Sequence, residues 1–508
     1  MAETQSIQSK KVFSKLLNTF FYFFTFLNIG ANFLGSPMVK YIYLVQLICM
    51  ALLCVTEKIN TMIWPFIIFS LFEGQGRVVW GYHPLFRLIF DILLVLLITR
   101  AIIIKRSFFS KEITPNMVRL FFILHLFWFG LELFNPNGAG FLASLATAKF
   151  YLFPLLLFFL FLNFPVDIHS DHAQKHIFKF TLILGLLAGL TIVQDIYKEE
   201  FMYGISQNYK SLFPSYSRFT GLTFRPWGTT FVPGGMGLFY FLSCGLLLLF
   251  NPKRISSYFP KQIFAKAILF IGISVILFSS FIGQVRSATL KLVGVFIFYH
   301  LFKFYGSKFK AKWLTSALII LLGVGIFSNS TLQSSLPDEL NIDRALSRWE
   351  GMTESNLTDH RAGLNEILHN LEKRVELPFG YGLGMTQNFL PAFAARRAQY
   401  IDRPSWYFWS MDNLYAFLIL ELGVGALFYI GLIFSLNATL FSMMISLIKK
   451  QAYKEFKIVS LSFTMVLIIT LFAWGSVSIP FNPVSFFFWF WSALGVSEYF
   501  KYRKAVGS

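Results

Sequence analysis

Charged residues are scarce in this chain, and acidic residues are the scarcest of them. Charged residues make up 14% of the 508 positions, with 25 aspartates and glutamates against 44 lysines and arginines. A soluble domain would not tolerate charge-free apolar runs such as those at 153–164 and 241–250. The three cysteines are too few and too unevenly spaced for a zinc or iron–sulfur site. We therefore expect Cys49, Cys54 and Cys244 to be buried small apolar residues.

What the chain has instead is apolar sequence along most of its length. Hydrophobic residues make up 56% of it, phenylalanine alone contributes 64, and the mean hydropathy is +0.61. Because about 20 apolar residues span a bilayer, we predict an all-α, polytopic membrane protein with about 12 to 14 transmembrane helices. The expected spans are 17–35, 38–56, 61–79, 84–104, 117–135, 147–164, 177–196, 234–250, 264–284, 287–303, 314–329, 412–436, 457–476 and 482–499.

The net charge of +19 comes largely from lysines and arginines in short loops between the apolar segments. This placement is the orientation signal of an inner membrane protein and argues against a groove for nucleic acid. The N-terminus has no signal-peptide cleavage site, so we place it in the cytoplasm. The outer turns at 135–140 and 475–482 then contain no lysine or arginine. Five predicted inner loops are basic: 105–111, 253–261, 308–312, 449–454 and 501–504.

Two longer polar segments, 197–233 and 330–411, fall on the predicted outer side. The chain thus divides into membrane helices within 1–329, a large outer loop, and C-terminal helices with a basic tail in 412–508. The large loop contains an amphipathic helical stretch that ends at Pro378, and it either lies on the membrane as a lid or contacts substrate. The apolar positions of this stretch are Leu364, Ile367, Leu368, Leu371 and Val375.

Arginine replaces lysine as the main basic residue on the predicted outer side. The large loop contains seven arginines and one lysine, and Arg218, Arg225 and Arg286 add to the set. A guanidinium grips phosphate oxygens two at a time, so the set suits a lipid diphosphate. Ion pairing with acids of the same loop is the simpler explanation for most loop arginines. Arg225 and Arg286 are stronger candidates, because each lies at a membrane boundary, where an unpaired charge is costly.

Four short motifs lie at the borders of the outer segments. They read FRPWGTTF at 224–231, QVRSA at 284–288, PFGYGLG at 378–384, and MDNLY at 411–415 followed by LELGVG at 420–425. The glycine-rich third motif is not a nucleotide-binding loop, since no strand precedes it and no lysine follows it. The informative pattern is the order: an arginine before one span, an arginine opening a later span, a long outer loop, and a polar residue plus asparagine opening the next helix.

In this order and topology the motifs resemble those of the O-antigen ligase and O-antigen polymerase family of the bacterial envelope, over roughly residues 60–500. The resemblance implies a multi-pass glycosyltransferase of the inner membrane whose active face is extracytoplasmic. Such an enzyme moves a glycan from undecaprenyl diphosphate to an acceptor, with no nucleotide sugar, metal or other cofactor. The expected partners are the lipid-linked glycan, membrane lipid, and a flippase and chain-length regulator of the same pathway, but no nucleic acid.

The resemblance implies catalytic roles for Arg225, Arg286 and Asp412. The two arginines would bind the carrier diphosphate and stabilise the charge that develops on it as it leaves. Asp412 would take the acceptor's hydroxyl proton, or it would only cap the helix that follows. Ligases of the family usually have histidine at this place, so the aspartate favours an O-antigen or exopolysaccharide polymerase. We predict substrate-binding roles for polar residues of the same segments: Arg218, Arg361, Arg374, Asn413 and Tyr415.

Glu421 lies on the helix face opposite Asp412, so we expect it to pair with a neighbouring helix. His169, His172 and His176 have a spacing that suits a metal, but we expect them in a solvated cytoplasmic loop.

Three other functions compete with a polymerase. The nearest is a ligase that transfers the glycan to lipid A core or to protein. A lipid-linked oligosaccharide flippase or other transporter would have charges near the bilayer midplane and repeated halves, and the sequence has few such charges and no repeat. A polyprenyl-phosphate-sugar transferase would have paired acids in the first outer loop, which here reads LGSP at 34–37.

Overall fold

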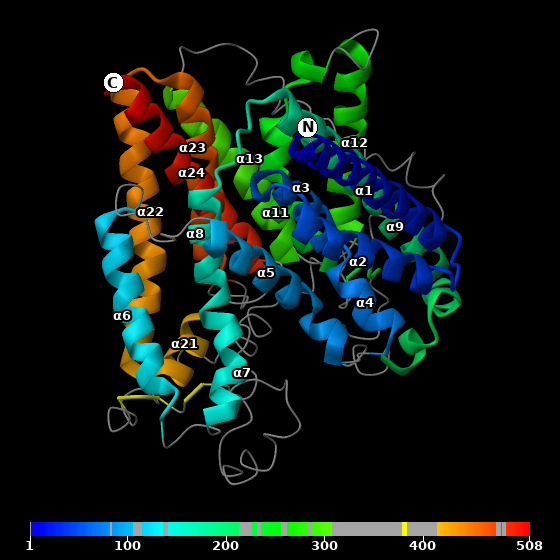
Figure 1. The fold of residues 1–508 in the computed structure, drawn as a ribbon, viewed down its shortest axis with the longest axis horizontal. Helices are drawn as coiled ribbons and strands as arrows, with labels where there is room; N and C mark the ends of the chain where they lie inside the picture. Colours follow the sequence, from blue (N-terminus) through cyan, green and yellow to red (C-terminus); the bar gives the residue numbers. More distant parts are fainter. Residues whose placement is uncertain are drawn as a thin grey trace, which may run out of the picture. The chain divides into compact units, whose positions relative to one another are not determined.

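In the computed structural model, every regular element within the described residues is a helix (Figure 1). This confirms the predicted all-α class. The described residues are 2–81, 84–104, 114–135, 141–212, 226–230, 235–255, 262–282, 286–306, 378–380, 382–383, 414–473, 479 and 484–507. The predicted span 314–329 and the amphipathic stretch 364–375 lie outside them.

Helices long and apolar enough to cross a membrane are present, as expected for a multi-pass membrane protein. Within the described part of the chain there are five: Val12–Phe33, Val39–Thr56, Asp171–Ile205, Phe417–Lys449 and Tyr453–Phe472. Shorter apolar helices accompany them, such as Gly235–Leu249. The exact number of spans stays a prediction.

The helices form two compact units that do not follow the order of the chain. The first contains α1 (Ala2–Phe33), α2 (Val39–Thr56), α3 (Ile59–Ser70), α4 (Glu73–Val79), α5 (Pro84–Ile104), α9 (Asp171–Ile205), α11 (Gly235–Leu249), η1 (Pro252–Ile255), α12 (Gln262–Ile282) and the start of α13 (Arg286–Gly306). The second contains α6 (Asn116–Glu132), α7 (Phe141–Tyr151), α8 (Phe153–Asn163), the rest of α13, α21 (Leu414–Leu422), η5 (Gly423–Gly425), α22 (Ala426–Lys449), α23 (Tyr453–Phe472) and α24 (Val484–Val506).

In the first unit, α1 packs along α2, and α9 packs along α12. Two glycines face each other in the second pair, where a Cβ on Gly185 would lie in ordinary contact with the Cα of Gly272, at 3.6 Å. The outward face of α2 is apolar, with Ile48, Leu52 and Val55 all exposed. Water would not favour such a face, and lipid would cover it. The three cysteines are buried, as predicted.

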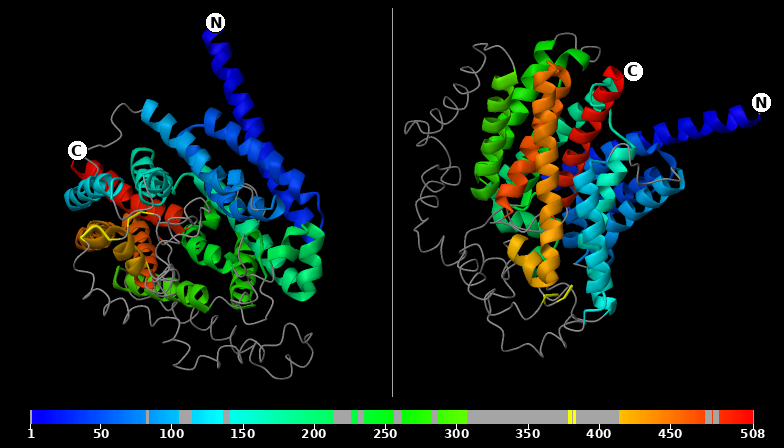
Figure 2. Two further views of the ribbon diagram at one scale, coloured as in Figure 1. Left: turned by 90° about the horizontal axis from the view of Figure 1, so that it is seen from below. Right: turned by 90° about the vertical axis from the view of Figure 1, so that its left-hand side faces the viewer.

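In the second unit, α22, α23 and α24 run side by side (Figure 2). α8 packs on α24, and α6 packs on α22. Large aromatic side chains fill this core, and both Trp489 and Trp491 are completely buried. Gly495 lets α24 approach its neighbours, because a Cβ there would lie 2.6 Å from the Leu440 side chain.

Three of the predicted continuous spans are interrupted. The span 61–79 is divided between α3 and α4, the span 147–164 between α7 and α8, and the span 412–436 between α21 and α22. Proline near the start of α8 and a left-handed Gly423 (φ +54) explain the second and third breaks.

The predicted histidine loop is wrong for two of its three residues. α9 begins at Asp171, where the Ser170 side chain caps it by accepting a 3.2 Å hydrogen bond from the Ala173 N–H. His172 and His176 therefore lie on the helix. His176 is buried, and its Nδ1 lies 2.5 Å from the Tyr22 hydroxyl.

Candidate functional site

Most of the residues predicted from the motifs lie outside the described part of the chain. These are Arg218, Arg225, Arg361, Arg374, Asp412 and Asn413. Arg286 is the first residue of α13, as predicted for an arginine that opens a span. The Tyr415 hydroxyl donates a 2.9 Å hydrogen bond to the Thr470 carbonyl, which ties the start of α21 to the end of α23. The geometry of the site is therefore visible in the segments that flank the predicted residues.

The segment 226–230, which directly follows Arg225, is held by one glutamine. Gln194 of α9 is fully buried, and its Oε1 accepts hydrogen bonds from the backbone N–H groups of Trp227 (3.1 Å) and Gly228 (2.6 Å). Its Nε2 donates to the Gly228 carbonyl at 3.2 Å. Gly228 has φ +61, and a Cβ there would lie 2.0 Å from a neighbouring side chain. The path of the chain after Arg225 is thus fixed by polar contacts that only this arrangement satisfies.

The same segment packs against the end of α4. Trp227 is buried in a cluster with Val78 and Val79, and its ring meets the Tyr209 ring edge-on at 5.1 Å. Asn208 Nδ2 donates a 2.8 Å hydrogen bond to the Val78 carbonyl at the end of the helix. Burial raises the pKa of Tyr209 above its ordinary value.

Cations lie at this end of the first unit. Arg77 forms an ion pair with Glu73 within α4, and its side chain is partly exposed. The Lys40 Nζ lies 4.1 Å from the centre of the Trp80 ring, a cation–π contact. Trp80 in turn packs against the cluster that contains Trp227.

A chain of buried side-chain amides connects α4 with α1 and α2. Gln75 donates to Asn32 at 3.0 Å, and Asn32 donates to Asn28 at 2.7 Å. Asn28 then donates to Gln46 at 3.0 Å, and Gln46 donates to Thr25 at 3.0 Å. All of these side chains are buried. Hydrogen bonds of this kind hold helices together in lipid, so this chain of side-chain amides fixes α4 against α1 and α2.

In the second unit, Pro378–Gly380, here called the PFG segment, docks on the turn η5. The Val424 N–H donates a 2.9 Å hydrogen bond to the Pro378 carbonyl. A Cβ on Gly380 would lie 2.6 Å from the Gly423 nitrogen, so the two backbones touch where only glycine fits. Phe379 stacks on Trp128 of α6, with ring centroids 5.1 Å apart. The third and fourth sequence motifs therefore meet in space.

Two fully buried carboxylates lie beside this docking point. Glu421 on α21 accepts a 2.6 Å hydrogen bond from the Tyr151 hydroxyl on α7, so the predicted pairing with a neighbouring helix is confirmed. Glu132 at the end of α6 accepts a 2.8 Å hydrogen bond from Asn135 Nδ2. The same amide also donates to the Phe379 carbonyl at 3.1 Å. Glu132 and the PFG segment thus share one hydrogen-bonding residue, Asn135.

His125 and Tyr429 complete this cluster. Both are fully buried, and their ring centroids lie 4.9 Å apart. Within the described residues, neither the His125 ring nitrogens, nor the Tyr429 hydroxyl, nor Oε1 of Glu132 has a hydrogen-bond partner of normal geometry. Buried polar groups are nearly always partnered, so three exceptions in one place mark a candidate site.

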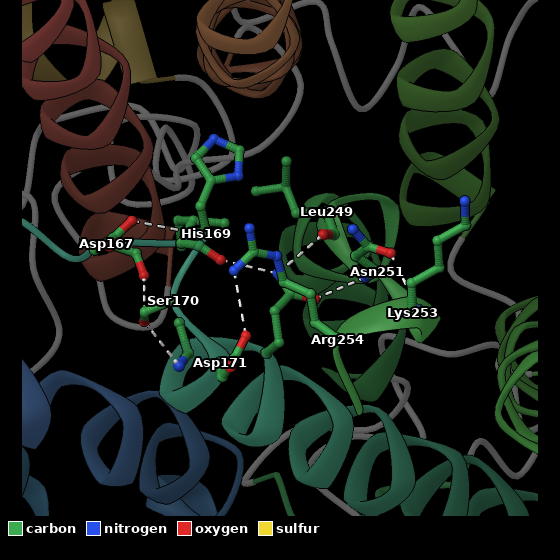
Figure 3. Close-up of polar contacts among 11 residues, drawn as sticks. Asp167, His169, Ser170, Asp171, Leu249, Asn251, Lys253 and Arg254 are labelled. Carbon is green, nitrogen blue, oxygen red and sulfur yellow. Dashed lines mark hydrogen bonds and ion pairs between the residues drawn. The ribbon is translucent and has the colours of Figure 1, made fainter. Parts of the chain in front are cut away.

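A further polar cluster fixes the start of α9. Figure 3 shows Arg254 reaching the Asp171 carboxylate, at 3.2 Å. Gln174 donates to the Ile168 carbonyl at 2.8 Å and accepts from the Asn251 N–H at 2.7 Å. These contacts clamp the beginning of α9 to the turn after α11, which is a structural role.

Sequence reasoning missed Gln194, Glu132 and His125 as candidates. Each is a polar residue inside a predicted span, and that is the signal by which they are recognisable. In the described ranges, no group of three or more His, Cys, Asp or Glu is arranged to hold a metal ion. The chain matches no protein-family model, no curated protein and no solved structure.

Proposed function

We propose that this chain is a membrane glycosyltransferase that moves a glycan from undecaprenyl diphosphate to a saccharide acceptor, as an O-antigen or exopolysaccharide polymerase. The resemblance of the motifs and the helical membrane fold support the proposal. The observation that carries it is the contact between the PFG segment and η5, which brings together two of the motifs on which the resemblance rests. The protein then lies in the bacterial inner membrane with 197–233 and 330–411 outside.

In the proposed reaction, the acceptor hydroxyl oxygen attacks C1 of the donor sugar while the bond from C1 to the diphosphate oxygen breaks. The bonding electrons leave with undecaprenyl diphosphate. Arg225 and Arg286 stabilise the negative charge that grows on it, because each guanidinium can hold two phosphate oxygens. Asp412 takes the hydroxyl proton.

The described residues support this chemistry by positioning. Gln194 fixes the backbone two and three residues after Arg225. The bond from the Leu414 N–H to the Ala473 carbonyl, at 2.9 Å, fixes the backbone two residues after Asp412. Catalytic groups must be held to within a fraction of an ångström to be effective, and buried hydrogen bonds of this kind do so.

The proposal is tested with purified protein in liposomes that contain an undecaprenyl-diphosphate-linked oligosaccharide. We expect longer lipid-linked chains without added nucleotide sugar. Arg286→Ala should abolish extension, and Arg286→Lys should restore only part of it, since lysine lacks the two-pronged contact. The matched control is Arg254→Ala, whose ion-pair partner is Asp171, and it should retain activity. Full activity in Arg286→Ala, or no extension of a cognate oligosaccharide, would reject the proposal.

A transporter of the same lipid-linked glycan is the second candidate. The buried Glu132, Glu421 and His125 favour it, because ionisable residues within membrane helices often mark transport pathways. The same liposomes separate the two functions. A transporter moves the lipid-linked oligosaccharide between leaflets and forms no new glycosidic bond, whereas a ligase extends only a lipid A core or protein acceptor.

The proposed orientation is tested by cysteine labelling in intact cells. Leu34, between α1 and α2, is 82% exposed, and Gln451, between α22 and α23, is also exposed. The native cysteines are buried and give a low background. A membrane-impermeant thiol reagent should modify Leu34→Cys in intact cells and Gln451→Cys only after lysis. The reverse pattern would overturn the orientation.

A further inference from the structure

Glu132 and Glu421 form a pair of buried acids in the second unit. They come from α6 and α21, both are 0% exposed, and both adjoin the PFG segment: Asn135 joins Glu132 to the Phe379 carbonyl, and a Cβ on Gly380 would lie 3.2 Å from the backbone carbonyl carbon of Glu421. Two ionised carboxylates in a low-dielectric interior repel each other, and such pairs commonly keep a proton. Oε1 of Glu132 has no hydrogen-bond partner of normal geometry within the described residues, so it can carry one, although the Trp128 side chain also interacts with this carboxylate.

Titratable groups surround Glu132 on the helices that pack there. Glu421 comes from α21, Tyr151 from α7, Tyr429 from α22 and His125 from α6 itself. Neither η5 nor the PFG segment contributes one. The His125 ring nitrogens and the Tyr429 hydroxyl have no hydrogen-bond partner of normal geometry within the described residues, which is an independent sign of a missing ligand.

The size of the missing ligand is limited by the aromatic rings. The His125 ring lies 4.9 Å from the Tyr429 ring and 6.3 Å from the Tyr151 ring, centroid to centroid. Rings at these separations are in contact and leave no room for a sugar. A proton needs no cavity, so it fits.

Asn135 links this pair of acids to the PFG segment. Its side-chain amide donates to Glu132 Oε2 at 2.8 Å and to the Phe379 carbonyl at 3.1 Å. A hydrogen bond to an ionised carboxylate is roughly twice as strong as one to a neutral acid. The charge on Glu132 therefore decides how firmly the amide is held, and the amide in turn holds Phe379.

We propose that Glu132 and Glu421 form a proton-binding site, and that its occupancy sets how firmly the PFG segment docks on η5. With Glu132 ionised, Asn135 is fixed and the segment is docked. With the proton bound, Asn135 loses its charge-assisted partner and the segment loosens. This inference does not depend on glycosyl transfer, because its readout is the docking itself.

The test uses a nitroxide spin label at position 378 of the full chain in detergent, with the three buried cysteines replaced by alanine. The side chain of Pro378 is exposed and its carbonyl makes the docking bond, so Pro378→Cys leaves that bond in place. The label's mobility is followed from about pH 5 to about pH 9, where buried carboxyl groups titrate. We expect the mobile fraction to be at least about twofold larger at the acidic end.

Two variants and one control decide the outcome. Glu132→Gln cannot release a proton, so its label should show the acidic spectrum at every pH. Asn135→Ala lacks the amide that joins Glu132 to the Phe379 carbonyl, so it should give a mobile label at every pH. A label at Tyr453, which is exposed at the start of α23, should not respond. An unchanged spectrum in the wild-type background, or the same transition in either variant, would overturn the proposal. If Glu132→Gln does not fold, Asn135→Ala decides alone.

Discussion

The hydroxyl of Tyr151 donates a 2.6 Å hydrogen bond to the carboxylate of Glu421, joining two helices whose residues are 270 positions apart. Both side chains are completely buried. A hydrogen bond in such surroundings is strong, and a carboxylate left without its donor is costly. This contact therefore helps to hold α21, and with it the turn η5, in place, together with the bonds that Leu414 and Tyr415 make at the end of α23.

Removing this donor should destabilise the protein. Tyr151→Phe keeps the ring and deletes only the hydroxyl, so we expect a loss of about 1.5–3 kcal/mol, the usual range for a hydrogen bond to a charged group. The measurement is the thermal unfolding midpoint in detergent. Tyr43→Phe is the matched control, because the buried Tyr43 hydroxyl has no hydrogen-bond partner within the described residues and lies in the other unit, so its loss should change little. Equal effects of the two substitutions would contradict the assigned role of the bond.

A side chain at Gly423 should displace the PFG segment. A Cβ there would lie 2.2 Å from the Pro378 carbonyl oxygen, and the glycine has φ +54. Gly423→Ala should cost about 1–3 kcal/mol through backbone strain and steric overlap. Gly130→Ala on α6 is the control, since nothing lies within 4 Å of its Cβ. The readouts are the unfolding midpoint and the mobility of the label at position 378, and an immobile label in Gly423→Ala would refute the contact.

Gln194 should matter for activity although it lies outside every motif. Gln194→Leu retains the volume but removes three hydrogen bonds to Trp227 and Gly228. We expect chain extension in liposomes to fall by about tenfold or more, which equals about 1.4 kcal/mol of lost positioning. Gln207→Leu changes an exposed residue shortly after α9 and serves as the control. Normal extension by Gln194→Leu would show that the path of the chain after Arg225 is not critical.

The regular helices are the part of the fold that sequence predicts well. The expected span 84–104 coincides with α5, and the expected span 38–56 differs from α2 by one residue. Apolar length alone determines these elements. The break between α3 and α4 was not foreseeable in this way. It leaves the Leu71 carbonyl without a helical partner, and the Thr229 hydroxyl satisfies it at 2.6 Å from a distant part of the chain.

The candidate site likewise has a part that the sequence predicts and a part that it does not. The placement of Arg286 at the start of α13 follows from local sequence, because a charge at a membrane boundary ends an apolar run. The cluster of Glu132, His125 and Tyr429 depends instead on how α6 and α22 pack. A polar residue inside an apolar span signals that a partner exists, but only the packing shows which one.

Asp412 can be tested as a base against its alternative role as a helix cap. Asp412→Asn retains the capping geometry, since asparagine caps about as well as aspartate, but the amide cannot accept the hydroxyl proton. A capping role predicts near-normal polymer. A catalytic role predicts turnover lower by about 100-fold or more, with accumulation of the lipid-linked repeat unit, because general-base catalysis contributes about that much. The measurement is polymer length and lipid-linked intermediate at equal protein levels. If Asp412→Asn forms near-normal polymer at a normal protein level, the carboxylate is a cap and the base must be sought elsewhere.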